Sequence, residues 1–280
     1  LSSTESKRQL LIEGDSGDQV ETPGDYWIEA GTIKKGNQTY SVYNHNESAE
    51  QIIVNKNVTF APDARIQIEL STIAAGNGGF VIHGECENDR SGTSVSSAGD
   101  VNGDGLADLI IGATDADPNG SASGSSYVVF GTTDNNTAIQ LSDVADGTGG
   151  FVIHGECESD TSGRSVSSAG DFNGDGLADL IIGANGTSSG SSYVVFGTTD
   201  NTTAIQLSDI AAGSGGFVIR GESEGDSSGR PVSSAGDING DGLADLIIGA
   251  HRADPNGSAS GSSYVVFGTT DNTTAIQLSD

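Results

Sequence analysis

The sequence predicts an all-β protein in which a small N-terminal β-module precedes three β-propeller-type blades of four antiparallel strands each. The first observation is an internal repeat, because the segment GGFVIHGECE at 78–87 returns at 149–158 and, as GGFVIRGESE, at 215–224. The second is the presence of 42 glycines in 280 residues, with short apolar runs between clusters of Gly, Asp, Asn and Ser. Short strands at regular spacing, in a repeat of about 70 residues, are typical of propeller blades.

The first 64 residues do not share this repeat and are interpreted as a separate β-module. Runs such as QLLIEG, YWIEAG, TYSVYNHN and EQIIVNKNVTF have the composition of strands, and Trp27 is expected in the core of the module. The join is placed near 61–65, because the segment RIQIELSTIAAGNGG that follows parallels a later segment at 138–150. The leader, residues 1–14, is a candidate for a strand donated to a neighbouring molecule.

Each copy of the repeat contains four apolar runs, which read GFVIHG, TSVSSAG, ADLIIGA and SYVVFG in the first copy. A fifth run, AIQLS, leads into the next copy. The runs LIIG and YVVF are apolar at consecutive positions, which predicts strands covered on both faces. The copies are assigned to 65–137, 138–203 and 204–280, the last including the opening strand of a further repeat. They differ mainly in one loop, 114–124 against 185–190, which is therefore expected at the surface.

An acidic nine-residue loop in each copy predicts a calcium site. The loops read DVNGDGLAD at 100–108, DFNGDGLAD at 171–179 and DINGDGLAD at 237–245. Side-chain oxygens at positions 1, 3 and 5, a glycine at 6, a backbone carbonyl at 7 and a carboxylate at 9 can surround a hard cation. The predicted ligands of three Ca²⁺ ions are Asp100, Asn102, Asp104, Leu106 and Asp108; Asp171, Asn173, Asp175, Leu177 and Asp179; and Asp237, Asn239, Asp241, Leu243 and Asp245.

The loop has two other interpretations, an EF-hand and a metal-free turn. An EF-hand requires a glutamate at position 12 and flanking helices, whereas this chain has Ile111, Ile182 or Ile248 there and strand-like flanks. A metal-free Asp/Asn/Gly turn is the second alternative. Three carboxylates within nine residues repel one another without a counter-ion, which favours calcium.

These motifs resemble the FG-GAP repeat, which forms the blades of the integrin α-subunit head and recurs in large bacterial surface proteins. The resemblance covers about residues 66–280, and the calcium loop followed by LIIGA is its most specific part. Ser91-Gly92, Ser162-Gly163 and Ser228-Gly229 stand at the Phe-Gly position, and GAT, GAN and GAH stand at the Gly-Ala-Pro position. The resemblance implies calcium-binding propeller blades in a secreted or cell-surface protein.

Composition narrows the function classes. With 39 acidic and 11 basic residues, the formal net charge is −28, which repels nucleic acids and anionic membranes. The sequence contains no apolar stretch of the roughly 20 residues that a membrane helix needs, and none of the common catalytic motifs. We therefore expect a structural or adhesive protein rather than an enzyme. A lectin-like propeller that binds a protein or glycan ligand, and a non-catalytic module of a secreted hydrolase, stay as alternatives.

Three blades are too few to close a propeller, since known examples have about four to eight. The sequence also ends on AIQLSD, which would open another repeat. Exposed strand edges promote association, so the expected partners are neighbouring subunits, in a homo-oligomer or a surface filament. Cys86 and Cys157 occupy equivalent positions and are open to either a free or a bonded state, and sequons such as Asn119 are open to glycosylation.

Overall fold

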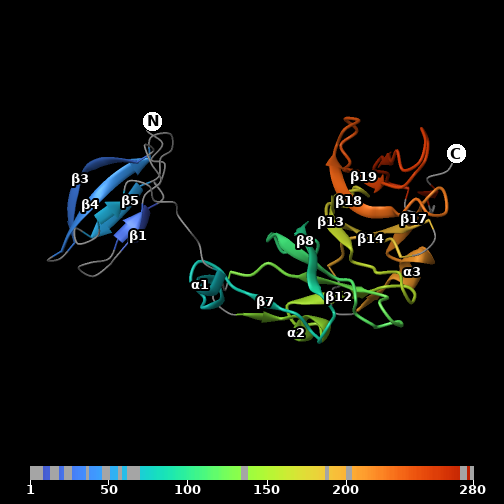
Figure 1. Ribbon diagram of the computed structural model, residues 1–280, viewed down its shortest axis with the longest axis horizontal. Helices are drawn as coiled ribbons and strands as arrows, with labels where there is room; N and C mark the ends of the chain where they lie inside the picture. The colour runs from blue at the N-terminus through green and yellow to red at the C-terminus, as the bar shows by residue number, and fades with distance from the viewer. Residues whose placement is uncertain are drawn as a thin grey trace. The chain divides into compact units, whose positions relative to one another are not determined.

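The computed structural model has two compact units, Leu1–Thr72 and Ile73–Asp280 (Figure 1). It describes the backbone of six strands between residues 9 and 61, residues 70–133, 138–186, 189–199 and 204–271, and the backbone of 276–277. The protein is all-β, as the sequence predicts. Both cysteines are free and exposed.

The N-terminal unit contains a four-stranded sheet and a separate parallel pair. The sheet has the order β1-β5-β4-β3, with the bounds Gln9–Ile12, Gln51–Asn55, Gln38–His45 and Trp27–Lys35. The pair consists of β2 (Gln19–Glu21) and β6 (Thr59–Ala61). Strand β1 runs parallel to β5 of the same chain, so one edge of the leader segment expected to serve a neighbour is used within its own unit.

In the second unit, three adjacent strands of each large sheet come from one copy of the repeat. They are β8 (Ser91–Gly99), β9 (Asp108–Ala113) and β10 (Ser125–Val129); β13 (Ser165–Gly170), β14 (Asp179–Ala184) and β15 (Ser191–Val195); and β18 (Ser228–Gly236), β19 (Asp245–Ala250) and β20 (Ser262–Val266). Within each set the neighbouring strands are antiparallel.

The fourth strand of each completed sheet comes from the following copy. Strand β12 (Gly150–His154) pairs with β10, and β17 (Gly216–Arg220) pairs with β15, both antiparallel. The sequence analysis assigned the run GFVIHG to one blade with the strands that follow it in the chain. This assignment is wrong, because the run pairs with the third strand of the preceding copy. The chain crosses between sheets at Gly155, whose N–H donates to the Gly124 carbonyl at 2.8 Å. A Cβ there would lie 2.0 Å from the Ser123 carbonyl oxygen, so only glycine fits.

The run AIQLS, expected as a strand, divides into a two-residue strand and a helical turn at 138–142 and at 204–208. The strands are β11 (Ile139–Gln140), β16 (Ile205–Gln206) and β21 (Ile276–Gln277), which run parallel to β7 (Ile82–His83), β12 and β17. The helices are α1 (Leu70–Ala74), α2 (Leu141–Ala145) and α3 (Leu207–Ala211). Leu141 and Val144 are three residues apart, so in a helix both point to the same side, and both are fully buried. Burial of this pair explains why the strand gives way to a helix.

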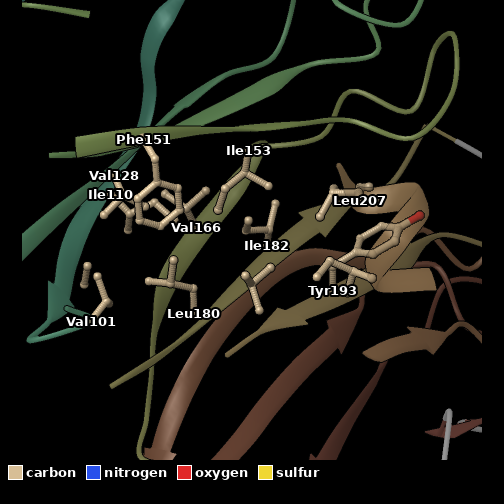
Figure 2. Close-up of a cluster of buried hydrophobic side chains, with 14 of the residues drawn as sticks. Val101, Ile110, Val128, Phe151, Ile153, Val166, Leu180, Ile182, Tyr193 and Leu207 are labelled. Carbon is tan, nitrogen blue, oxygen red and sulfur yellow. The ribbon is translucent and has the colours of Figure 1, made fainter. Parts of the chain in front are cut away.

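The core lies between neighbouring sheets. Figure 2 shows one cluster of buried hydrophobic side chains, in which side chains of the first copy contact side chains of the second. From the first copy come Val101, Ile110 and Val128, and from the second Phe151, Val166 and Leu180. Every residue of β14 is buried, which confirms that LIIG is covered on both faces in the central copy.

Adjacent sheets approach so closely that backbone meets backbone. A Cβ on Gly183 would lie 1.9 Å from the Gly229 carbonyl oxygen, and a Cβ on Gly112 would lie equally close to that of Gly163. Gly163 and Gly229 have φ values of 83° and 80°, in the region that favours glycine. The glycine of LIIGA and the Ser-Gly pair of the next copy therefore form one contact, repeated between copies.

We expect Gly183→Ala to lower the free energy of unfolding by about 3 kcal/mol or more, because the added methyl group has to push two sheets apart. Gly213→Ala is the matched control, since its Cβ would meet nothing within 4 Å and only its φ of 88° is unfavourable. That strain costs about 1 kcal/mol. Urea unfolding followed by circular dichroism measures both, and equal losses would contradict the close contact.

Candidate metal centre

Each acidic loop connects the first and second strands of a sheet, so its position is fixed by the hairpin. In the first copy, Asp100 follows the last residue of β8 and Asp108 is the first residue of β9. Asp100 organises the turn between them. One of its carboxylate oxygens accepts N–H groups from Gly103 at 2.7 Å and Asp104 at 3.1 Å, and the other accepts that of Gly105 at 2.9 Å.

The middle of the loop is ordered by the side chains at positions 3 and 5. The amide oxygen of Asn102 accepts the N–H of Asp104 at 2.9 Å, and its amide nitrogen donates to Asp104 Oδ2 at 3.0 Å. Asp104 Oδ1 accepts the N–H of Leu106 at 2.8 Å. These bonds place oxygens at alternate positions of one tight, solvent-exposed turn.

The second and third loops repeat the arrangement bond for bond. Asp171 and Asp237 each accept three backbone N–H groups, as Asp100 does. Asn173 with Asp175 and Asn239 with Asp241 reproduce the contacts of the middle residues. Three identical loop conformations follow from three nearly identical sequences.

The aspartate at position 9 has a structural role that the sequence analysis did not predict. Asp179 is fully buried, and its Oδ2 accepts N–H groups from Phe172 at 3.0 Å and Asn173 at 3.2 Å. Its Oδ1 accepts the N–H of Gly197, beyond the third strand, at 2.9 Å. Burial raises the pKa of Asp179 to about 7, against the lowering effect of these hydrogen bonds. The side chain joins the start of the loop to the end of β15.

Asp108 and Asp245 make the same connections in the other copies. Asp108 accepts the N–H groups of Val101 and Gly131, and Asp245 accepts those of Ile238 and Gly268, all at 2.8–2.9 Å. The glycine after the run YVVF recurs in every copy, and this was the available signal for the bond. Position 9 was predicted as a ligand, and its carboxylate already accepts hydrogen bonds at both oxygens.

The chemistry of the donor set fits a hard cation. Positions 1, 3 and 5 present carboxylate and amide oxygens, the type of donor that Ca²⁺ prefers, and the loops contain no basic residue. Among the described residues, no three His, Cys, Asp or Glu side chains are grouped closely enough to hold a metal by themselves. An ion in the first loop would therefore depend on the Asn102 amide oxygen and the Leu106 carbonyl beside the carboxylates.

Neighbouring loops are in direct contact, which the sequence did not reveal. The Asp100 carbonyl accepts the N–H of Ala178, from the second loop, at 3.0 Å, and the Asp171 carbonyl accepts that of Ala244, from the third, at 3.0 Å. A Cβ on Gly103 would lie 3.1 Å from the Leu177 side chain. Position 7 of one loop thus lies against position 4 of the loop before it, and the three loops form a row.

The comparison with protein families identifies the repeat. A family model described as the FG-GAP repeat matches residues 91–129, 162–195 and 231–266. The chain contains three FG-GAP repeats. Each match includes the acidic loop and reaches the end of the third strand, so the fourth strand of each sheet lies outside it. No curated protein matches the sequence.

FG-GAP repeats are non-catalytic modules that are typical of extracellular and surface proteins. Among the described residues, no helix has the length and apolar character needed to cross a membrane.

The longer loops of the FG-GAP array have two different environments. Asn119, in the loop 114–124, donates from its amide nitrogen to the Gly155 carbonyl at 2.7 Å and to Gln206 Oε1 at 3.0 Å. The nitrogen of this sequon is therefore engaged with one residue of the second copy and one of the third. The equivalent loop in the third copy lies beside a hollow of about 370 Å³, whose lining includes Glu222 and Asp254.

Alanine at Asp179 is expected to lower the free energy of unfolding by roughly 3 kcal/mol in the presence of a chelator, because the buried N–H groups of Phe172 and Gly197 lose their acceptor. Alanine at the exposed Asp175 is expected to cost less than about 1 kcal/mol in the same buffer. Thermal unfolding of the two variants with EDTA measures the difference. Equal stabilities would show that position 9 has no structural role without metal.

Proposed function

We propose that the protein is a calcium-stabilised structural or adhesive protein that acts outside the cell in assembly with neighbouring subunits. The observation that carries the proposal is the set of three acidic loops, which share one conformation and lie in a row. Each loop contains three carboxylates and no basic residue, so the row concentrates negative charge. Binding of a divalent cation in each loop would remove this repulsion.

Side-chain oxygens and one backbone carbonyl of each loop would hold the ion. Asp171, Asn173 and Asp175 would contribute side-chain oxygens in the second copy, and Leu177 its carbonyl. Asp179 would contribute indirectly, by fixing the start of the loop against β15, with any direct contact through the remaining lone pairs of its oxygens. Bound Ca²⁺ supplies charge neutralisation and a cross-link between these oxygens. Because adjacent loops are hydrogen-bonded to each other, stiffening one loop supports the next.

A non-enzymatic role outside the cell agrees with these features. Extracellular calcium modules have dissociation constants of about 10⁻⁴ to 10⁻³ M, which suits the millimolar calcium found outside cells. The net charge of −28 disfavours binding to nucleic acids and anionic membranes. The hollow beside 251–261 favours a ligand-binding role as the second candidate. Its acidic lining suits a cationic or hydroxyl-rich ligand, such as a glycan.

Calcium titration is expected to show three bound ions per chain, with dissociation constants near 10⁻⁴ M. At 1 mM Ca²⁺ and a dissociation constant of about 0.1 mM, each site adds about 1.4 kcal/mol to the free energy of unfolding. Isothermal titration calorimetry counts the ions, and thermal unfolding with and without chelator measures the stabilisation. Fewer than two ions, or a melting temperature indifferent to chelator, would refute the proposal.

The variant Asp175→Asn is expected to reduce the count from three ions to two, because it removes one carboxylate from the second loop only. Asp143→Asn, on α2 and outside the loops, makes the same change of charge and should keep all three. Loss of an ion in both variants would mean that net charge, rather than the loops, governs binding.

A further inference from the structure

The large hydrophobic side chains that are exposed among the described residues gather at the two ends of the FG-GAP array. The N-end face is defined as Val95, Leu106 and Leu109, and the C-end face as Ile238, Ile247, Val265 and Phe267. The N-end face belongs to the first copy of the repeat, and the C-end face to the third copy. The central copy has no member in either face.

Each of these positions is better buried where a neighbouring copy covers it. Val265 is 44% exposed, whereas Val128 and Val194, at the same position of the first two copies, are fully buried. Val95 is 66% exposed, whereas the equivalent Val166 is 4% exposed. The faces are therefore two halves of an inter-copy contact, each without its other half.

The internal contacts show which surface fits which. Between the first and second copies, Val128 of the C-end type lies in one cluster with Val166 and Leu180 of the N-end type. Position 7 of the loop follows the same rule. Leu177 lies against Gly103, while Leu106 is exposed and a Cβ on Gly240 would meet nothing within 4 Å. The C-end face is thus built to receive an N-end face.

The strand edges are complementary in the same way. Strand β20 pairs with β19, and no described strand occupies its other edge, where β10 and β15 bind β12 and β17. Strand β7 pairs only with β11 among the described strands. The five residues 79–83, which end with β7, read GFVIH and are identical in sequence to β12. The register of β10 with β12 places Ser262 opposite His83 and Val266 opposite Gly79.

We propose that the C-end face of one chain binds the N-end face of a second, identical chain. Strand β7 of the second chain is added as an antiparallel strand to β20 of the first chain. The inference deepens the proposed assembly and rests on it for the nature of the partner, but it does not depend on calcium. It assigns the donated strand to residues 79–83 rather than to the leader.

The test uses two full-length variants that each block one face, Val265→Glu on the C-end face and Val95→Glu on the N-end face. Both side chains are exposed, so both variants should fold, which circular dichroism checks. Sedimentation velocity is expected to show wild-type protein as a species of two chains or more and each variant alone as a monomer, because each variant lacks one of the two faces that every contact needs. Ser142→Glu, on the exposed surface of α2, is the control and should behave as wild type.

Mixing decides whether the contact joins unlike faces. A doubly blocked variant, Val265→Glu with Val95→Glu, should be strictly monomeric. Tagged Val265→Glu, which keeps only its N-end face, should capture Val95→Glu, which keeps only its C-end face, and should not capture the doubly blocked protein. A monomeric wild type, or assembly that survives in the doubly blocked variant, would overturn the proposal. The series is run with 1 mM Ca²⁺ and with EDTA, so that a failure of calcium binding is seen separately in the titration.

Discussion

The strand that each copy contributes to the preceding sheet is the contact on which the rest of the FG-GAP array depends. Strand β12 completes the sheet of the first copy, and its covalent continuation into β13 begins the next sheet. A sheet without this strand leaves apolar side chains of its third strand in water, as β20 shows. Neighbouring sheets therefore stabilise each other through backbone pairing as well as side-chain packing, and folding of one copy depends on the copy beside it.

The acidic loops of the array also depend on backbone hydrogen bonds between separate segments of the chain. A buried carboxylate is costly unless hydrogen bonds satisfy it, and Asp179 meets this requirement with three backbone N–H groups. These hydrogen bonds restrict the conformation of the turn that begins at Asp171. A preformed turn loses less conformational entropy on binding a cation than a flexible one. The structural carboxylate and the predicted ligands thus have separate tasks within one nine-residue motif.

Much of this fold could be predicted from the sequence, because strand positions and loop motifs are local properties. Glycine clusters, apolar runs and the spacing of aspartates located the repeat, and the family comparison confirmed it. Partner choice is not local. The run GFVIHG is equally apolar whichever sheet it joins, and its place is set by long-range pairing with the third strand of the preceding copy. The role of Asp179 was missed for the same reason, since its acceptor geometry involves Gly197, far along the chain.

Each sheet takes its fourth strand from the following copy of the repeat, so the boundaries of the sheets differ from those of the repeats. This offset has an evolutionary consequence. Duplication or deletion of one whole repeat in the gene replaces each joint by another of the same kind, since the outgoing third strand and the incoming GFVIH segment are nearly identical in every copy. Array length can then change without a new interface having to be selected. Near-identity between copies, together with a length difference confined to the loop at 114–124, is the record that such recent unequal exchange would leave.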